Sequence, residues 1–231
     1  MTRKLLLLAV LLFITSGQSQ EAPIAFSDAL HNNLKAYNKA SNAAYENKDF
    51  AEGQRLFDSL VRYKLVGTQF DDFTLKGYQS KKVQLNQFKK PVFIVTYASW
   101  CVINKGDIPA LNQLANEHRS DLQVIVLFWD EKSALKKIAP QFNDAIKICY
   151  ANESYDNDSH IIATLKHTLG FPTSYFMDEN KKIVSIKRIS NDYQPKMPSE
   201  KALSISYAQF NGVINESLLS KNIATSTLAT F

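Results

Sequence analysis

Two nearly continuous apolar runs limit what this chain can fold into. They are Pro91–Tyr97 and Gln123–Trp129, and both are rich in β-branched and aromatic residues. A strand with one face in water alternates apolar and polar residues, whereas a run that is apolar throughout is typical of a strand buried on both faces. The two runs therefore predict the central parallel strands of an α/β sheet.

The segments around these runs supply the other elements of the sheet. Helices are predicted at about 103–118, 132–142, 160–169 and 205–219. Further strands are predicted at 70–75, 82–85, 145–150, 174–177 and 183–186. The first two short strands are expected to join at a Gly77 turn, and the last two form a hairpin. This order predicts a sheet that is parallel in the middle and mixed at its edge. The segment 190–201 is expected to be a loop, and the tail after Ser220 is expected to fray.

The segment before the sheet has helical periodicity. Apolar residues recur on two stripes between Phe26 and Val66, and Asn47–Asp49 separates them as a turn with Asp49 capping the second helix. The pair resembles one tetratricopeptide-like hairpin, present in a single copy. Because a single hairpin cannot bury its own apolar face, packing against the following domain is favoured over a partner-binding repeat.

The N-terminus has the pattern of a secretory signal peptide. Arg3 and Lys4 precede an apolar run, Leu5–Ile14, which small and polar residues follow. A membrane span needs roughly 20 apolar residues, so cleavage is favoured over retention. Cleavage is expected between Gly17 and Gln20, although the following two residues are alternative edges. No cysteine follows the run as a lipid acceptor.

We therefore expect an exported protein, periplasmic or extracellular, with no membrane span after cleavage. Four parts are predicted: a signal peptide (1–20), a helical extension (21–66), an α/β domain (67–220) and a C-terminal tail (221–231).

The composition excludes several classes of function. The chain has 27 Lys+Arg and 22 Asp+Glu, a net charge of +5, and removal of the two cations in residues 1–20 leaves +3. This charge is spread along the chain, which indicates solubility and not nucleic-acid binding. Two cysteines exclude a disulfide-dense scaffold and a four-thiolate zinc site. His160 and His167 lack a completing ligand nearby, so no metal or other cofactor is predicted.

The chemistry is predicted to lie where the first buried strand ends. There Cys101 stands at the predicted start of a helix. The unpaired amide N–H groups and the positive dipole at a helix N-terminus lower the pKa of a thiol and favour the nucleophilic thiolate. Cys101 is therefore the candidate nucleophile.

Two motifs around this position resemble a known family. Tyr97–Cys101 matches F-W-A-x-W-C at the end of a strand, and Lys105, Asp107 and Pro109 fall on the following basic, acidic and proline positions. Gly170–Thr173 matches a later G-x-P-T element. On these motifs the chain resembles the TlpA-like branch of the thioredoxin superfamily, exported thiol–disulfide oxidoreductases related to the alkyl-hydroperoxide reductases.

The resemblance covers residues 70 to about 219 and implies a thioredoxin-like fold, with the N-terminal hairpin as an extension. It also implies an active-site groove. Pro172 would be a cis-proline facing the nucleophile, with an ordinary turn proline as the alternative. The backbone of Phe171 would pair with an extended substrate segment, and Thr173 would lead into the next strand. Trp100 would shield the thiol.

Two further positions bear on the kind of chemistry. Asp107 either tunes the pKa of Cys101 or relays a proton, as the family acid does, or is a first-turn carboxylate favoured by the helix dipole. Lys105 is expected to be solvated. Peroxiredoxins place a threonine three residues before the nucleophile, and Ala98 at that position disfavours peroxide reduction.

One departure from the family motif leaves three interpretations open. Asn104 stands where the family has its second cysteine, which normally resolves the mixed disulfide. Cys101 is a monothiol nucleophile resolved by an outside small-molecule or protein thiol, or it pairs with Cys149. Otherwise the site is degenerate, and the domain is a redox-inactive scaffold that binds through the Pro172 groove, the helical hairpin or both. Pairing requires Cα atoms within roughly 7 Å, and a lone strand cysteine is more often a buried apolar residue.

The leading prediction is thiol–disulfide chemistry at Cys101 on protein or small-molecule thiols and disulfides, with a redox partner protein as one source of the second thiol.

Overall fold

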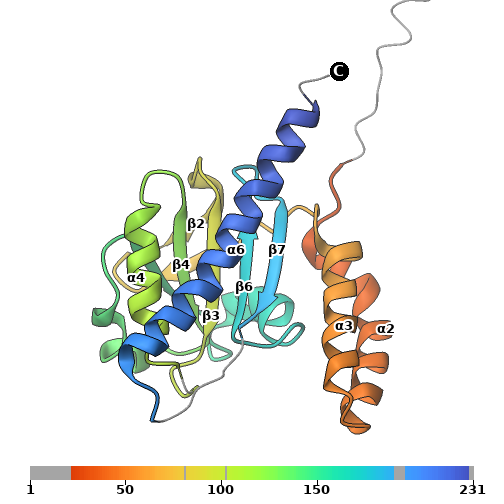
Figure 1. Cartoon of the computed structure of the whole chain (residues 1–231), viewed down its shortest axis with the longest axis horizontal. Helices are drawn as coiled ribbons and strands as arrows, with labels where there is room; N and C mark the ends of the chain where they lie inside the picture. The colour runs from red at the N-terminus through yellow and green to blue at the C-terminus, as the bar shows by residue number, and fades with distance from the viewer. Residues whose placement is uncertain (1–21, 81, 102, 190–195, 229–231) are drawn as a thin grey trace, which may run out of the picture.

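The chain forms a seven-stranded mixed sheet between two layers of helices (Figure 1). The computed structural model describes residues 22–80, 82–101, 103–189 and 196–228, so the predicted signal peptide lies outside the described residues. The strands are β1 (Thr74–Gly77), β2 (Val83–Gln84), β3 (Val92–Tyr97), β4 (Gln123–Phe128), β5 (Ile146–Tyr150), β6 (Thr173–Met177) and β7 (Ile183–Arg188). Their order is β2-β1-β5-β4-β3-β6-β7.

The centre of the sheet is parallel, as the apolar runs predict. β3 pairs in parallel with β4, and β4 with β5, whereas β1, β2, β6 and β7 join antiparallel to their neighbours. Every residue of β3 and β4 is buried. The predicted α/β class, with a parallel centre and a mixed edge, is confirmed.

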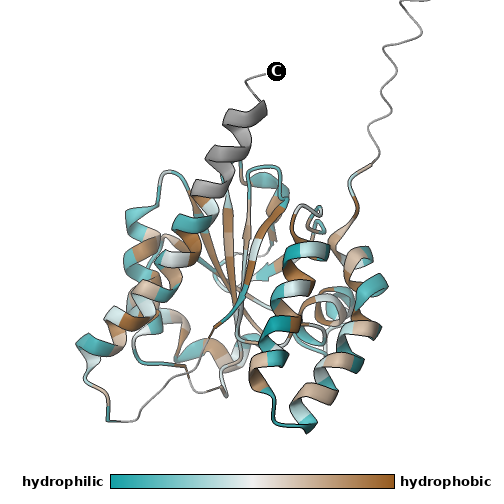
Figure 2. Cartoon of the chain, turned by 45° about the vertical axis from the view of Figure 1, so that its right-hand side comes forward, coloured by the Kyte–Doolittle hydropathy of each residue, from teal (hydrophilic) through white to brown (hydrophobic). Residues whose placement is uncertain are grey.

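Alternate residues of β3 face two separate apolar clusters. Phe93, Val95 and Tyr97 pack with residues of α4 (Asp107–Glu117) and α6 (Ser199–Leu228), which cross one face of the sheet (Figure 1). The intervening residues of β3 face the second cluster, which the N-terminal helices share. Figure 2 shows that the central strands are largely hydrophobic, whereas the helices around them carry both hydrophobic and hydrophilic residues.

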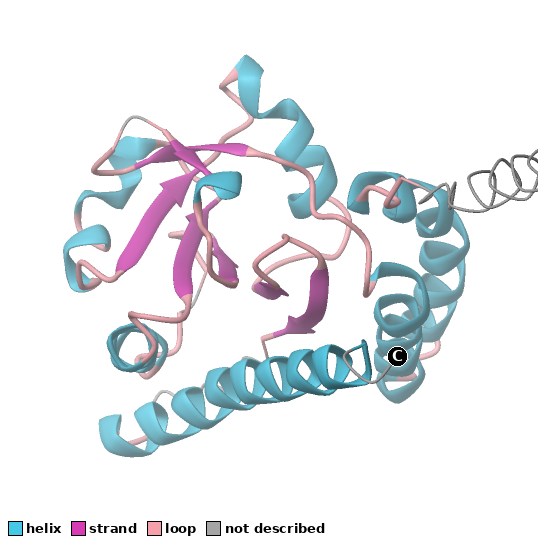
Figure 3. Cartoon of the chain, turned by 90° about the horizontal axis from the view of Figure 1, so that it is seen from above, coloured by secondary structure: helices cyan, strands magenta, loops and turns pink. Residues whose placement is uncertain are grey.

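The N-terminal hairpin packs against the sheet domain. It consists of α2 (Phe26–Glu46), α3 (Phe50–Leu60) and a π-helical turn, η1 (Val61–Leu65), and it lies on the side where β7 forms the sheet edge (Figures 1 and 3). The Asp49 carboxylate accepts a hydrogen bond from the Glu52 N–H at 2.9 Å, which confirms the predicted cap. The Asp71 carboxylate accepts the N–H and the hydroxyl of Ser27 and fixes the start of α2 to the domain.

Two predicted helices form only short or irregular turns. In place of a helix over 132–142 there are two 3₁₀ turns, η3 (Lys132–Lys136) and η4 (Ala139–Gln141). Pro140 lies inside the second turn, and its missing N–H cannot continue an α-helix. The helix expected at 160–169 is a 3₁₀ turn, η5 (Asp156–Asp158), followed by α5 (Ser159–Ile161) and a π turn, η6 (Ile162–Lys166).

The C-terminal helix is longer than the periodicity predicts. α6 begins at Ser199 and continues to Leu228, beyond the predicted end at residue 219 and into the segment predicted to fray. The prediction of a loop at 190–201 is wrong for its last three residues, which belong to α6, and residues 190–195 lie outside the described ranges. The Pro198 carbonyl accepts the Ala202 N–H at 3.0 Å and starts the helix.

The first strand also begins later than predicted, and Gly77 lies within it. Gly77 pairs with Cys149 of β5, and the chain folds back immediately afterwards. A Cβ at Gly77 would lie 2.1 Å from the Ser80 hydroxyl oxygen. The close approach of two chain segments, and not a turn conformation, therefore requires glycine here.

Replacing Tyr175 with phenylalanine is expected to stabilise the fold. Tyr175 is fully buried in β6, and within the described residues its hydroxyl has no hydrogen-bond partner. An unsatisfied buried polar group costs about 1–3 kcal/mol, so the free energy of unfolding should rise by about 1 kcal/mol. Tyr97→Phe is the matched control, because the Tyr97 hydroxyl donates to Asp107 at 3.0 Å and its loss should destabilise. Urea unfolding of both variants checks the prediction; equal destabilisation would contradict it.

Candidate functional site

The loop after β3 carries Cys101 and is longer than the sequence predicts. α4 begins at Asp107, six residues after Cys101, so the prediction that the thiol lies at a helix start is wrong. Gly106 precedes the helix where the loop meets α6, and a Cβ there would lie 2.1 Å from the Ala202 carbonyl oxygen. The Asn104 side-chain oxygen accepts the Gly106 N–H at 3.1 Å. This hydrogen bond and the close approach to α6 fix the turn that precedes the first residue of α4, Asp107.

The environment of Cys101 raises its pKa instead of lowering it. The side chain is partly exposed and packs against the core cluster on the hairpin side of the sheet. Burial raises the pKa of the thiol, a backbone hydrogen bond at Ala98 opposes this, and the Asp130 carboxylate raises it further. The predicted low pKa required a helix N-terminus at Cys101, and the structure places that terminus six residues away.

Asp130 is a residue of the site that the sequence analysis missed. It follows β4 and is 6% exposed. Its two carboxylate oxygens accept the backbone N–H of Ser99 at 2.7 Å and the Ser99 hydroxyl at 2.6 Å. Because β3 and β4 are adjacent and parallel, their carboxyl ends meet at one edge of the sheet. The sequence feature that could have identified Asp130 is its position directly after the second apolar run, Gln123–Trp129.

The cis-proline loop lies beside this segment, as the resemblance implies. The Phe171–Pro172 bond is cis. The Trp100 ring meets the Phe171 ring edge to face, with centroids 5.6 Å apart. Trp100 is nevertheless 69% exposed. It stands at the rim of the site.

Thr173 is buried and joins the cis-proline loop to the sheet. Its N–H donates to the Thr96 hydroxyl oxygen, and the Thr96 hydroxyl donates to the Thr173 carbonyl, both at 3.1 Å. The strand β6 therefore starts directly after Pro172, with its first residue fixed on β3.

Asn104 of the loop and Asp107, the first residue of α4, are both buried. Asp107 is 4% exposed and accepts hydrogen bonds from the hydroxyls of Tyr97 and Ser206, at 3.0 and 2.6 Å. Burial raises the pKa of Asp107, and these hydrogen bonds oppose the shift. The acid thus connects α4 to β3 and α6. Lys105 is exposed.

Cys149 lies in the middle of the sheet. It is fully buried on β5, and burial raises its pKa to about 12. Its cross-strand partner on β4 is Leu127, which pairs in turn with Thr96 of β3. Adjacent strands lie about 4.8 Å apart, so Cys149 is roughly 10 Å from β3. Both cysteines are free thiols in the structure.

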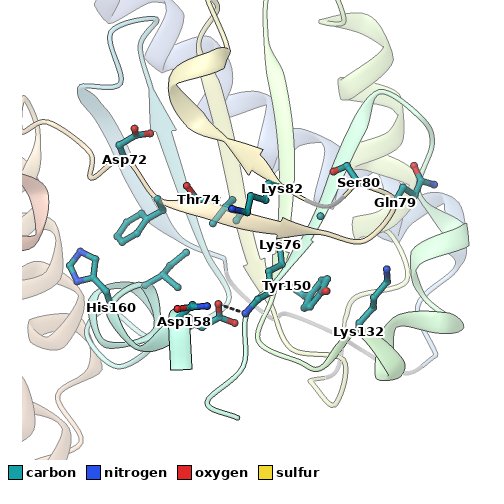
Figure 4. A pocket seen from close by; sticks show the side chains of 15 residues that line it. Asp72, Thr74, Lys76, Gln79, Ser80, Lys82, Lys132, Tyr150, Asp158 and His160 are labelled. Atoms are coloured by element: carbon teal, nitrogen blue, oxygen red, sulfur yellow. Dashed lines mark hydrogen bonds and ion pairs between the residues drawn. The ribbon is translucent and has the colours of Figure 1, made fainter. Parts of the chain in front are cut away.

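A cavity of about 780 Å³ lies between the β1–β2 hairpin and the turn at 156–161. It does not include Cys101 or the cis-proline loop. Figure 4 shows Lys76 donating to Asp158, at 2.6 Å, on one side of it. Within the described part of the chain, no group of three or more His, Cys, Asp or Glu side chains is placed to hold a metal ion. Among the described helices, none has the length and apolar character needed to cross a bilayer.

Comparison with known proteins gives consistent matches. A sequence profile of the AhpC/TSA family matches residues 66–186, slightly more than half of the 231-residue chain. The thioredoxin-like protein YneN of Bacillus subtilis is 27% identical over 127 residues, which is 52% of this chain and 69% of that protein.

Two solved structures are similar to this one. The thioredoxin domain of a thiol-disulfide oxidoreductase from Bacteroides vulgatus aligns with 63% of this chain and 96% of its own, with a TM-score of 0.45 and 17% identity. The exposed lipoprotein thioredoxin of Streptococcus pneumoniae aligns with 59% of this chain and 98% of its own, with a TM-score of 0.43 and 21% identity.

Proposed function

Because this chain belongs to the AhpC/TSA family of the thioredoxin superfamily, we propose that it carries out thiol–disulfide exchange with Cys101 as a monothiol nucleophile. The observation that supports the proposal is a partly exposed Cys101 next to Trp100, whose ring contacts Phe171 of the cis-proline loop, with Asn104 in the place of a second cysteine. The similarity to a protein named thioredoxin-like supports the same kind of chemistry.

Net reduction of a substrate disulfide needs two thiols from outside the chain, whereas exchange needs one. The Cys101 thiolate attacks one sulfur of a substrate disulfide, forms a mixed disulfide and releases the other sulfur as a thiolate. A second thiol, from a small molecule or a partner protein, attacks the substrate sulfur of the mixed disulfide. Cys101 leaves as a thiolate and takes up a proton. A third thiol reduces the new disulfide when net reduction occurs; otherwise the result is exchange or isomerisation.

Cys149 is less suited to resolve the mixed disulfide. It is fully buried, and with a pKa of about 12 it holds almost no thiolate at neutral pH. The thiolate is the attacking species in disulfide exchange. The monothiol route is therefore favoured over pairing of the two cysteines.

The raised pKa of Cys101 affects both halves of the cycle. Less thiolate is present at neutral pH, so attack on the substrate is slow. A thiol of high pKa is also a poor leaving group, so the mixed disulfide with Cys101 persists. This combination favours a long-lived covalent complex with the substrate over rapid turnover.

We also propose that the reaction takes place outside the cytoplasm. Arg3, Lys4 and the apolar run Leu5–Ile14 support export, and an oxidising compartment would supply disulfide substrates.

A second candidate function is non-redox binding. The raised pKa of Cys101 and the buried asparagine at position 104 favour a scaffold that holds a partner in the cis-proline groove without covalent chemistry.

The pH dependence of thiol reactivity tests whether Cys101 is an available nucleophile, and reaction with peptide disulfides then separates the two candidates. The uncharged reagent 2,2′-dithiodipyridine reacts with a thiolate and releases one thiopyridone. Because the pKa of Cys101 is raised, the rate is expected to increase about tenfold per pH unit from pH 6 and to level off above 8.5, the ordinary pKa of a cysteine. Peptide mapping should place the adduct at Cys101. Cys101→Ser should release no thiopyridone and gives the background rate. Cys149→Ser should retain the wild-type rate.

Two results would overturn the proposal. One is a Cys149→Ser variant as inert as Cys101→Ser. The other is a wild-type protein that forms no mixed disulfide with disulfide-containing peptides at any pH in this range, which would leave the binding function.

A further inference from the structure

A small cavity adjoins the cis-proline loop on the side away from β3. It has a volume of about 260 Å³ and is formed by the segment 169–173, by Arg188 and Ile189 at the end of β7, and by Tyr45 of the N-terminal hairpin. Ligand pockets usually enclose about 300–1,000 Å³, so this one is of the size of a side chain and not of a cofactor.

Arg188 is the charged group of this cavity, and its side chain is firmly held. The guanidinium lies over the Phe57 ring, 4.2 Å from the ring centroid. Its N–H groups donate to the hydroxyl oxygens of Tyr45 at 3.0 Å and Tyr37 at 2.8 Å. Within the described residues, no carboxylate lies in ion-pair distance of Arg188. A guanidinium has five N–H donors, so donors remain for a ligand.

Tyr45 adds a second donor beside this cation. Its hydroxyl oxygen already accepts from Arg188, which leaves its O–H free to donate to an anion between them. Tyr45 is 40% exposed, so this edge of the cavity is open to solvent. A carboxylate accepts two or more hydrogen bonds and carries the complementary charge.

The cavity is within reach of a substrate held at the cis-proline loop. Arg188 is the cross-strand partner of Thr173, the residue after Pro172. It is therefore about 4.8 Å from β6, and an extended segment rises about 3.3 Å per residue. An extended substrate paired with the cis-proline loop would therefore bring side chains within about three residues of its reacting cysteine near Arg188.

We propose that Arg188 and Tyr45 form a specificity subsite for an acidic side chain close to the reacting cysteine of an extended polypeptide substrate. This inference rests on the proposed function and names its substrate class. It also assigns a role to the N-terminal hairpin, which supplies Tyr45 and the Phe57 ring that orients Arg188.

Single-turnover exchange with matched peptides tests the proposal. Each peptide carries one cysteine as a 2-thiopyridyl mixed disulfide, with glutamate or glutamine two residues before or after it. Attack by Cys101 forms the peptide mixed disulfide and releases one thiopyridone. For at least one placement, glutamate is expected to raise the rate constant about tenfold over glutamine, since a charged hydrogen bond is being compared with a neutral one. In Arg188→Gln the ratio of the glutamate to the glutamine rate constant should fall to about one. In Tyr45→Phe this ratio should lie between one and the wild-type value.

Lys187→Gln is the matched control. It removes the same charge from the neighbouring residue of β7, whose side chain points to the opposite face. Its glutamate-to-glutamine ratio should equal that of the wild type. Equal rates for both peptides in the wild type, or equal losses in Arg188→Gln and Lys187→Gln, would overturn the subsite. Absence of thiopyridone release from either peptide would instead overturn the proposed function.

Discussion

The Phe26→Ala variant is expected to lose about 3–5 kcal/mol of unfolding free energy, which is a large part of the 5–15 kcal/mol that stabilises a typical domain. Phe26 is the first residue of α2 and is fully buried. Its ring centroid lies 5.4 Å from that of Phe70 and 6.1 Å from that of Tyr175 in β6. Removal of the ring leaves a cavity between the hairpin and the sheet.

Phe50→Ala is the control for this prediction. Phe50 is the first residue of α3, so the substitution and the helix position are the same, but its side chain is 66% exposed. Its contact with the Tyr45 ring, at 6.0 Å between centroids, is a surface contact. The expected loss is within about 0.5 kcal/mol, as is usual for surface positions. Urea unfolding followed by circular dichroism measures both changes, and equal losses would mean that the hairpin does not share the core of the domain.

Much of the fold follows from local patterns in the sequence. A run that is apolar at every position predicts a strand buried on both faces without reference to distant residues. β3 and β4 therefore lie where the two runs predict them. The two helical stripes and the Asp49 cap likewise depend only on neighbouring residues. Errors occur where distant residues decide the structure. The Asp71 carboxylate, inside the strand predicted at 70–75, instead accepts a hydrogen bond from the start of α2, and β1 begins at Thr74.

The site shows the same division. The motif residues place Trp100, the neighbour of Cys101, against Phe171 of the cis-proline loop, and this placement follows from the chain order and the sheet topology. The pKa of Cys101 was not predictable in the same way. It depends on burial against the hairpin side of the sheet and on Asp130, which follows β4, and α4 begins too late to lower it. The residue before α4, Gly106, lies against Ala202 of α6, which is almost 100 residues away in the sequence.

Restoring a second cysteine at position 104 is expected to convert a monothiol site into a dithiol one. In the Asn104→Cys variant the new thiol would stand three residues after the nucleophile, at a position that is 7% exposed in the wild type. The loss of the hydrogen bond from the Gly106 N–H to the asparagine side chain should cost about 1 kcal/mol. The fold should tolerate this cost.

The gain arises because the resolving step becomes intramolecular. Well-oriented intramolecular groups reach effective concentrations of about 10⁵ M or more, and even a small fraction of that value far exceeds millimolar external thiol. Reduction of insulin disulfides with a dithiol reductant should therefore be at least about 100-fold faster than in the wild type. Mass spectrometry of the oxidised variant should show an intramolecular disulfide between residues 101 and 104.

Two variants make this result specific to the second sulfur. Asn104→Ser removes the same amide and has no thiol, so it should match the wild type. Cys101→Ser combined with Asn104→Cys should be inactive, because the buried thiol alone cannot reach a protein disulfide. If Asn104→Cys folds and yet gains nothing, the groove around Cys101 and Pro172 does not admit a protein disulfide, and binding without exchange becomes the better description of the site.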